Sequence, residues 1–373
     1  MGSGIHSSAD ARRIARRRLP WMVFDYIDGA AGQETGAARH RAAFDALEFQ
    51  PRILRDVSQR SLESHLFGTP TLAPFGISPM GMCNLSGVGA DLMLARLAAR
   101  EKVPLGVSTV ASTAMEPLIE AAEGHAWFQL YFSGDGTGTF KLVERARAAG
   151  YGTIVLTVDV PEVGRRPREL RHGFTMPFRI GPKQFVDFAL HPRWSLAALL
   201  KGRPQMANFD MDGFDFDRTD SRAKADFDTL RRLRAMWPGK LVVKGVLSTA
   251  DAILLRDAGV DAIQVSSHGA RQLESAPAPI TMLGEIRAAL GPDFPLFFDS
   301  GLRSGEDVVK AYAKGAGFTF LGRILQFAIA AEGEEGLQKL WQVLRDEVSI
   351  TLAQIGATGL SPDALRDVLR RQG

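Results

Sequence analysis

The chain is poor in cysteine and in long apolar stretches, and it carries little excess charge of either sign. Cys83 is its single cysteine among 373 residues, which excludes disulfides and cysteine-rich metal sites, so we expect no metal centre and a reducing, cytoplasmic location. No apolar run reaches the roughly 18 residues of a membrane-spanning helix. The 45 basic and 42 acidic residues leave a net charge of +3, too little over this length to indicate a nucleic-acid partner.

Short apolar runs alternate with amphipathic segments along most of the chain. The runs with the length and composition of buried strands are residues 71–79, 103–109, 126–131, 153–159, 240–245, 261–267, 295–300 and 317–322. Segments with helical period lie between most neighbouring runs, and several begin at Ser, Thr or Asp and end at Gly, as capped helices do. Eight such units predict an α/β fold, a (β/α)8 TIM barrel, with an open parallel sheet as the weaker alternative.

The spacing of the predicted strands indicates how the chain is organised into domains. Its length admits two domains, but a single barrel domain over residues 1–373 accommodates all the runs, with residues 1–70 as an N-terminal extension. Residues from about 160 to 239 form a connection far longer than the others and rich in proline, and such connections are usually lids or binding loops. We expect the N-terminal stretch and a last helix over about 333–355 to pack outside the barrel.

Two residues at the predicted strand ends are unusual there. In a barrel of this type the active site is built where the strands end and the following loops begin. Lys244 closes one apolar run and His268 follows the next, where glycine or serine would be ordinary turn residues. For either residue alone, a structural role is as open as a catalytic one.

The segment SSHGARQLE pairs a histidine with an arginine. His268 and Arg271 are separated by two small residues, which permit close approach of a ligand. Imidazole accepts a proton near neutral pH, and a guanidinium binds a carboxylate through two parallel hydrogen bonds, so the pair indicates a 2-substituted acid as substrate. The later segments FFDSGLRSG and FLGR have glycine and arginine at the usual phosphate site of such barrels.

A series of motifs resembles the FMN-dependent α-hydroxy acid oxidase and dehydrogenase family. In chain order these motifs are LPWMVFDYIDGAA, FQPRILRDVS, FQLY, LTVDVPEVGRR, LVVKGV, SSHGARQL, FFDSGLRSG and FLGR. The resemblance extends from about residue 8 to 365. It implies bound FMN, a small 2-hydroxy acid as substrate, and quinone or O₂ as electron acceptor.

The resemblance also implies roles for individual polar residues. His268 corresponds to the base, and Asp159 to the carboxylate that orients it and stabilises the imidazolium. Tyr26 and Tyr131 correspond to tyrosines that hydrogen-bond the substrate carboxylate and the reacting hydroxyl, although Tyr26 taken alone suits a core position. Lys244 would lie beside flavin N1 and O2, where its charge would stabilise negative charge on the reduced ring.

Substrate binding is assigned to two arginines, and two positions near the flavin depart from the glycolate oxidase pattern. Arg271 and Arg166 correspond to the pair that binds the substrate carboxylate, although spacing alone does not select Arg166 from its neighbouring arginines. Gly81 stands where glycolate oxidases usually have alanine, and Val110 where they have tryptophan. We expect both changes to enlarge the space near the flavin and to favour a bulkier substrate than glycolate.

The cofactor contacts that the resemblance implies are distributed over the strand ends. Gln129 and Thr157 taken alone also suit inward-facing strand residues with satisfied hydrogen bonds. The predicted FMN ligands are Pro79, Met80 and Gly81 facing N5, Ser108, Gln129 and Thr157 at the pyrimidine edge, Lys244, Ser266, Asp299 on the ribityl chain, and Gly301, Arg303, Gly322 and Arg323 at the phosphate.

The predicted function is therefore oxidation of an (S)-2-hydroxy acid, aromatic or long-chain and mandelate-like, to the 2-oxo acid. One rival is an oxidase of the same fold that passes electrons to O₂ and makes H₂O₂. A rival from another class is a phosphate-binding barrel without chemistry that serves as an interaction module. The joint presence of the base, its carboxylate, the lysine, both arginines and both tyrosines argues against this second rival.

The long connection contains a basic and apolar stretch at residues 179–203. Five basic residues against one acidic residue are interleaved there with aromatic and aliphatic residues, a composition that suits a segment lying on an anionic bilayer. The pattern resembles the mandelate dehydrogenase branch of the family. It favours peripheral contact with the inner face of the cell membrane, with a lid or a subunit contact as the alternative, and the family resemblance implies a homotetramer.

Overall fold

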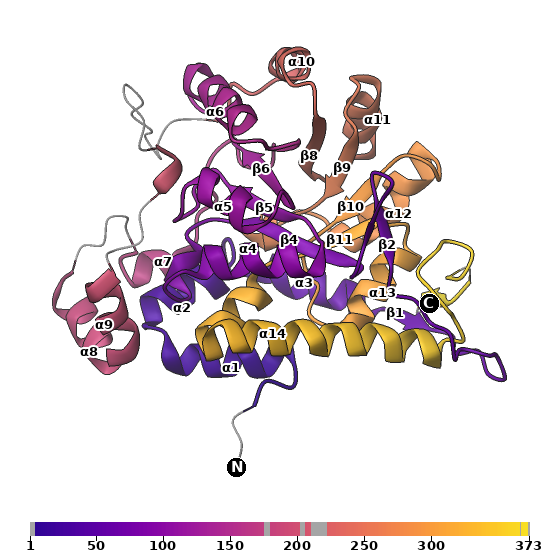
Figure 1. Cartoon of the computed structure of the whole chain (residues 1–373), viewed down its shortest axis with the longest axis horizontal. Coiled ribbons are helices and arrows are strands. Elements are labelled where there is room, and N and C mark those ends of the chain that lie inside the picture. The colour runs from indigo at the N-terminus through magenta and orange to yellow at the C-terminus, as the bar shows by residue number, and fades with distance from the viewer. Residues whose placement is uncertain (1–3, 175–179, 202–205, 210–221, 366, 372–373) are drawn as a thin grey trace.

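Eight parallel strands close into a barrel. The structure is a computed structural model and describes residues 4–174, 180–201, 206–209, 222–365 and 367–371. The strand order around the barrel is β10-β11-β4-β5-β6-β7-β8-β9, which confirms the predicted (β/α)8 fold (Figure 1). The strands are β4 (Phe75–Met80), β5 (Leu105–Ser108), β6 (Ala126–Leu130), β7 (Thr153–Thr157), β8 (Lys240–Val246), β9 (Ala262–Val265), β10 (Leu296–Phe298) and β11 (Phe318–Leu321).

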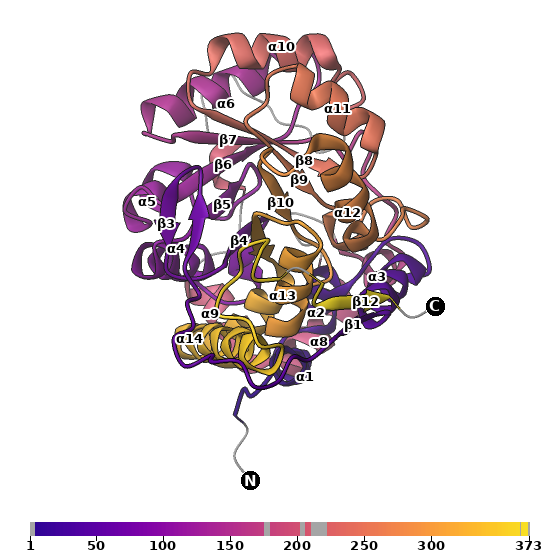
Figure 2. The ribbon, with the colours of Figure 1, turned by 90° about the vertical axis from the view of Figure 1, so that its right-hand side faces the viewer.

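Helices follow the strands and surround the barrel (Figure 2). They are α4 (Ala90–Glu101), α5 (Met115–Ala121), α6 (Thr137–Ala148), α10 (Phe227–Met236), α11 (Thr249–Asp257), α12 (Pro279–Leu290), α13 (Gly305–Ala313) and α14 (Arg323–Gln354). The predicted caps are present: the side chains of Asp226, Ser248 and Ser304 accept backbone N–H groups in the first turns of α10, α11 and α13. These caps satisfy donors that the helix itself leaves without partners.

A short hairpin lies against the amino-terminal end of the barrel. Its strands are β2 (Ser64–Leu66) and β3 (Thr69–Thr71), and Phe67 in its turn packs against Trp127 and Phe297. The predicted start of the first barrel strand at residue 71 is therefore wrong, because Thr71 pairs with Ser64 in this hairpin. Aromatic side chains fill this end of the barrel, so a ligand site is left to the carboxyl end.

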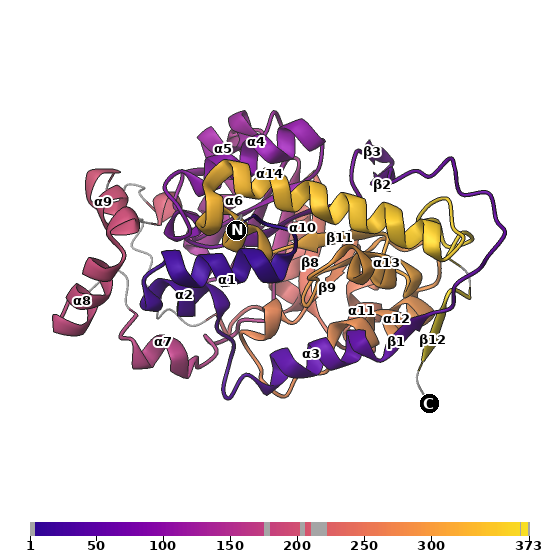
Figure 3. The ribbon, with the colours of Figure 1, turned by 90° about the horizontal axis from the view of Figure 1, so that it is seen from below.

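The N-terminal extension packs outside the barrel, as predicted. Helix α1 (Ser8–Arg18) lies along α14, as Figures 1 and 3 both show. It is followed by α2 (Trp21–Asp28), α3 (Thr35–Asp45) and β1 (Leu47–Phe49), and β1 pairs with the C-terminal β12 (Leu369–Arg371). The last helix begins at Arg323 rather than near 333, and a break at Glu332 and Gly333 separates its two parts, so the sequence pattern identified only the second part.

The long connection after β7 forms short helices. They are α7 (Pro167–Arg171), α8 (Pro182–Leu190), α9 (Pro192–Lys201) and the 3₁₀ helix η2 (Ala207–Phe209). Helices α8 and α9 lie side by side at the edge of the molecule, away from the barrel (Figure 1 and Figure 3). Residues 179, 202 and 203 of the predicted membrane-contacting stretch fall outside the described residues. Among the helices that the structure describes, none combines the length and the apolar character needed to cross a bilayer.

Phe297 tests the aromatic packing at the amino-terminal end of the barrel. Its side chain is buried, with ring centroids 5.4 Å from Phe67 and 6.0 Å from Phe320. We expect Phe297→Ala to lower the free energy of unfolding by about 3–5 kcal/mol, because a cavity replaces the ring. Leu254→Ala, at a half-exposed position, should change it by less than about 0.5 kcal/mol. Urea titration measures both values, and equal losses would contradict the assigned packing.

Candidate active site

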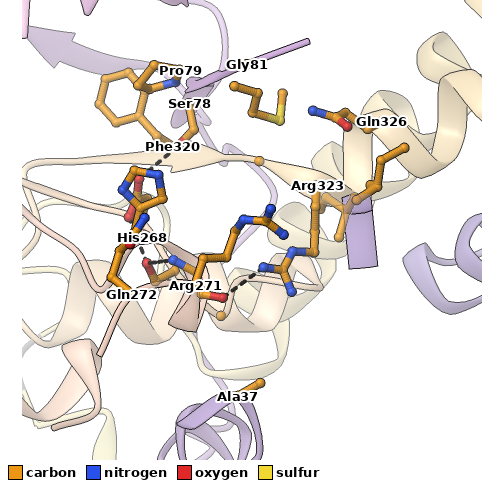
Figure 4. Close-up of a pocket in the computed structure, with 18 of the residues that line it drawn as sticks. Ala37, Ser78, Pro79, Gly81, His268, Arg271, Gln272, Phe320, Arg323 and Gln326 are labelled. Atoms are coloured by element: carbon orange, nitrogen blue, oxygen red, sulfur yellow. Dashed lines mark hydrogen bonds between the residues drawn. The ribbon is translucent and has the colours of Figure 1, made fainter. Parts of the chain in front are cut away.

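A cavity of about 420 Å³ lies at the carboxyl ends of the barrel strands. Figure 4 shows His268, Arg271 and Arg323 around it, with Pro79 and Gly81 across from them. The N-terminal extension and the long connection also contribute to its wall. The predicted site residues that line it are Tyr26, Pro79, Met80, Gly81, Val110, Tyr131, Arg166, Lys244, His268, Arg271, Asp299, Gly301, Arg303, Gly322 and Arg323.

The other predicted site residues do not line this cavity and come from strand ends around it. They share low exposure, since four of them are buried and the fifth, Asp159, has a side chain only 12% exposed. These residues are Ser108, Gln129, Thr157, Asp159 and Ser266. The structure thus gathers every predicted residue at one end of the barrel.

His268, the candidate base, is hydrogen-bonded to the carboxylate of Asp159. The Nδ1 atom of His268 lies 2.9 Å from Oδ1 of Asp159, so a neutral imidazole donates its Nδ1–H to the carboxylate and presents Nε2 as the proton acceptor. The hydroxyl of Tyr131 lies 3.5 Å from Nε2. Burial, together with the negative charge of Asp159, raises the pKa of Tyr131. Tyr131 therefore stays protonated and acts as a hydrogen-bond donor.

The turn that carries the base has an unusual backbone. His268, Gly269 and Ala270 all have positive φ, at 56°, 65° and 63°, a conformation that costs about 1–3 kcal/mol for non-glycine residues. Hydrogen bonds hold the turn in place: the hydroxyl of Ser300 accepts the backbone N–H groups of Ser267 and Gly269 at 3.2 and 3.0 Å. The base is therefore fixed by its surroundings as well as by its side-chain partner.

The two candidate carboxylate-binding arginines share a glutamate. Arg271 donates from Nη2 to Oε1 of Glu169 at 2.9 Å, and Nε of Arg166 lies 3.3 Å from the same oxygen. Arg271 Nη1 donates to the backbone carbonyls of Tyr26 and Gly29. These contacts with described residues use three of the five guanidinium N–H groups of Arg271. Two guanidinium groups thus meet at one carboxylate, an arrangement that suits an anionic substrate.

Lys244 and Asp299 form a buried ion pair at the mouth of the barrel. Nζ of Lys244 lies 3.1 Å from Oδ2 of Asp299 and donates to Ser266 Oγ at 2.7 Å. Burial opposes ionisation of Asp299, but the charge of Lys244 and the hydrogen bonds around it hold the pKa of Asp299 below its ordinary value. The carboxylate also accepts hydrogen bonds from Ser78 and Gln264 at 3.0 and 2.9 Å.

Positive charge gathers at the other end of the cavity. Burial and repulsion from Arg271 lower the pKa of Arg323 to about 10, and burial also lowers the pKa of Arg303. Burial and the charge of Arg323 lower the pKa of His40, on α3, to about 4. Arg323 donates to the backbone carbonyls of Gly269 and Asp28, which are neutral groups. Nearby acidic groups, Asp28 and Glu34 among them, do not offset the effect of burial on Arg323, so a phosphate bound here would be a favourable partner for this end.

Three buried polar atoms at strand ends have no hydrogen-bond partner in the described part of the chain. They are Nε2 of Gln129, Oγ1 of Thr157 and Oδ2 of Asp159. The Oε1 atom of Gln129 accepts a hydrogen bond from Ser108 Oγ at 3.1 Å, which leaves the amide N–H groups as donors. Because unpaired buried polar atoms are costly, this donor and hydroxyl fit the polar edge of a flavin. With the cationic end, the residues present fit FMN.

Gly81 and Val110 face each other, which corrects the prediction that both enlarge the site. A Cβ on Gly81 would lie 2.5 Å from Cγ2 of Val110, too close for real atoms. The valine methyl thus already occupies the space next to Gly81, so the glycine does not by itself add volume. The gain of space depends on the small size of Val110 alone.

Three residues around the cavity were not singled out from the sequence. Glu169 bridges the arginines, the guanidinium carbon of Arg222 lies 4.4 Å from the ring centroid of Tyr131, and His40 lines the cationic end. Glu169 stands three residues after Arg166, a spacing at which side chains on a helix interact, so a local signal existed. Arg222 and His40 had none, because tertiary packing brings them to the cavity.

The barrel and this cavity define a flavin-type oxidoreductase of hydroxy acids, with a candidate base, a candidate carboxylate-binding pair and a candidate phosphate end in one site. Residues 15–368 match the FMN-dependent dehydrogenase family, and the chain belongs to that family. The predictions of family, fold, FMN cofactor and 2-hydroxy acid oxidation are confirmed. The roles of individual residues stay predictions.

Known relatives match over almost the whole chain. It is 39% identical over 98% of its length to a putative L-lactate dehydrogenase of Mycobacterium tuberculosis, of which it covers 89%. It is 38% identical over 98% of its length to (S)-mandelate dehydrogenase of Pseudomonas putida, of which it covers 95%. A crystal structure described as the monotopic membrane protein (S)-mandelate dehydrogenase aligns with a TM-score of 0.93 at 36% identity, covering 99% of this chain and 100% of that one.

Thr157 tests the fit to the cofactor. Because its hydroxyl has no partner among the described residues, we expect Thr157→Val to leave the stability of the FMN-free protein unchanged or higher, and to weaken FMN binding by about tenfold through one lost hydrogen bond. Thr153→Val, at the opposite end of the same strand, should leave the affinity unchanged. Fluorescence titration with FMN measures both affinities. Equal affinities for Thr157→Val and the wild type would contradict the assigned contact.

Proposed function

We propose that the protein oxidises an (S)-2-hydroxy acid with an aromatic or long side chain to the corresponding 2-oxo acid. The observation that carries this proposal is the pair of His268 and Asp159, 2.9 Å apart, with His268 lining the same cavity as Arg166 and Arg271. A base beside a carboxylate-binding pair suits an acid that loses a proton next to its carboxylate.

His268 accepts a proton of the substrate at Nε2. The oxidation removes two electrons and two protons; one proton goes to His268, and FMN, when bound, supplies the acceptor for the electron pair and the second proton. Asp159 fixes the imidazole orientation through Nδ1–H and stabilises the imidazolium that forms. Tyr131, held protonated, donates a hydrogen bond to the substrate oxygen whose charge changes during oxidation.

Arg271 and Arg166 bind the substrate carboxylate, with Glu169 between them. The N–H groups of Arg271 that no described residue accepts suit a two-point contact with a carboxylate. The guanidinium of Arg271 also lies over the ring of Tyr26, 5.2 Å from its centroid. This contact restricts both groups, so the substrate carboxylate meets a site that is already ordered.

The remaining strand-end residues hold the cofactor. Ser108, Gln129 and Thr157 would bind the pyrimidine edge, and Lys244, next to Ser266, would supply positive charge beside it. The backbone at Pro79, Met80 and Gly81 would face the flavin ring, and Asp299 would bind the ribityl chain. Gly301, Arg303, Gly322 and Arg323 would hold the phosphate. The supporting observations are the unpaired polar atoms and the cationic end described above.

Substrate size is set near Val110. A phenyl ring that buries about 100 Å² of apolar surface there would gain roughly 2.5 kcal/mol over glycolate, before ordering costs. That difference corresponds to between one and two powers of ten in kcat/KM. The relatives named for lactate and for mandelate show that the family accepts both sizes, so the choice for this chain rests on its own cavity.

A substrate panel tests the function. Under anaerobic conditions the FMN-loaded protein should be reduced by (S)-mandelate or 2-hydroxyoctanoate with a kcat/KM at least about tenfold above that for glycolate. Val110→Trp should shrink or reverse this ratio. The flavin absorbance reports reduction directly, and a wild-type preference for glycolate would overturn the assigned substrate class.

A base variant provides the control for that panel. His268→Gln should keep FMN but lose substrate reduction by several orders of magnitude, because the proton acceptor is removed. Reduction of this variant at a rate near that of the wild type would show that another group is the base.

We further propose that α8 and α9 rest on the inner face of the cell membrane and that quinone takes the electrons. Apolar side chains of these helices are exposed, among them Phe185, Leu199 and Leu200 at 67%, 79% and 82%. The acidic Asp187 is buried, where it accepts the first backbone N–H groups of α2, so it does not oppose binding to anionic lipid. Exposed Lys183 supports such binding.

Vesicle binding tests this surface. Replacing Leu199 and Leu200 by serine should weaken binding to vesicles of phosphatidylcholine and phosphatidylglycerol by about tenfold or more. The matched control replaces Leu254 and Ile350, exposed apolar residues elsewhere, and should bind like the wild type. Co-sedimentation measures both. Equal binding by the two double variants would refute the surface.

Two further expectations remain predictions. One is the homotetramer, which sedimentation of the holoenzyme would test. The other is the single-domain organisation over residues 1–373, which a single calorimetric unfolding transition would support.

A further inference from the structure

Strand β8 carries a bulge next to the candidate base and carboxylate. Lys244 pairs with Gln264 and Val246 pairs with Val265. The paired residues are adjacent in β9 but separated by one residue in β8, so Gly245 is the extra residue of the bulge. Its φ is +104°, a conformation that residues other than glycine rarely adopt. Bulges of this kind redirect neighbouring side chains and are frequent beside active sites.

The bulge brings the backbone of Gly245 directly against the side chain of Asp159. A Cβ added to Gly245 would lie 2.6 Å from both Cβ and Cγ of Asp159 and 2.9 Å from its Oδ2. The two strands are tied beside this contact, because the backbone N–H of Val158 donates to the carbonyl of Lys244 at 3.0 Å. Asp159 is thus held between Gly245 on one side and His268 on the other.

A second cavity, of about 730 Å³, lies beside this contact. Asp159, Gly245, Val246 and Leu247 are among the residues that line it. A side chain at position 245 would therefore have room to push the carboxylate aside without a collision with the barrel core. Displacement of Asp159, rather than failure to fold, is the expected result of adding one methyl group here.

We propose that Gly245 is a positioning residue that acts through Asp159: the absence of its side chain lets Asp159 approach and orient His268. This inference rests on the proposed function of His268 as the base. The inference goes beyond that function in one respect. The Asp159 carboxylate can reach His268 because the bulge in β8 is formed by a residue without a side chain. The same bulge follows Lys244, so the test must separate an effect on Asp159 from an effect on the lysine.

The experiment uses the FMN-loaded Gly245→Ala protein. We expect anaerobic reduction of the flavin by mandelate to slow by about 100-fold, because the carboxylate is displaced rather than removed and so orients its histidine poorly. FMN affinity should change by less than about threefold, because Lys244 stays in place. The low-field proton resonance of the His268 Nδ1–H should shift or disappear. A hundredfold loss of FMN affinity, or an unchanged resonance, would overturn the proposal.

Gly150→Ala is the matched control for backbone strain. Gly150 has a φ of +91°, and its Cβ would meet no described atom within 4 Å. The flavin of the Gly150→Ala protein should be reduced at a rate within about twofold of the wild-type rate. If this control slows as much as Gly245→Ala, positive φ alone explains the effect and the contact with Asp159 does not.

Double variants show whether Gly245 acts through Asp159. In an Asp159→Asn background, Gly245→Ala should slow reduction by less than about threefold further, whereas another hundredfold loss would mean an independent role. If Gly245→Ala alone unfolds, Asp159→Gly should restore folding, since it removes the three atoms nearest to the new Cβ. No recovery in thermal unfolding would refute the contact.

Failure of the proposed function would look different. In that case no 2-hydroxy acid would reduce the wild-type flavin, while the His268 resonance would still respond to Gly245→Ala. If 2-hydroxy acids reduce the wild-type flavin and Gly245→Ala changes neither the reduction rate nor the His268 resonance, the role of Gly245 is refuted and the proposed function is not.

Discussion

The arrangement of side chains at the mouth of the barrel depends on the ion pair and the hydrogen bonds of the Asp299 carboxylate. One of its oxygens accepts hydrogen bonds from Ser78 on β4 and Gln264 on β9 and pairs with Lys244 on β8. Removing either partner of a buried ion pair leaves a charge that is expensive to bury alone. Ser266 accepts from Lys244 and from the backbone N–H of the base, so the ion pair also fixes the turn that carries His268.

The barrel could be predicted because its signals are local. Each buried strand is a short apolar run, and capping residues mark the helices that follow, so all eight strands were found without any contact information. The pairs β1–β12 and β2–β3 were not found. Each strand in them has only three residues, which is too short for a periodic pattern, and β1 pairs with the far end of the chain.

The residues of the candidate site also fall into a group that local sequence patterns predict and a group that they do not. His268, Lys244 and Asp159 stand at strand ends, and barrel closure alone brings strand ends together. Arg222 and His40 reach the cavity from the long connection and from α3, whose paths no local pattern predicts. The contact between Gly81 and Val110 also depends on tertiary packing. The sequence shows that both residues are small, but only the structure shows that Val110 fills the space beside Gly81.

The proposed membrane surface and the substrate cavity are mechanically connected. Asp187 in α8 accepts the backbone N–H groups of Trp21 and Met22 and so caps α2, the helix whose Tyr26 lines the cavity and lies under Arg271. A buried cap of this kind contributes about 1 kcal/mol to helix stability. The helix of the proposed membrane surface therefore also holds the first turn of the helix that packs against Arg271, so the proposed membrane surface and the candidate substrate site share one long connection.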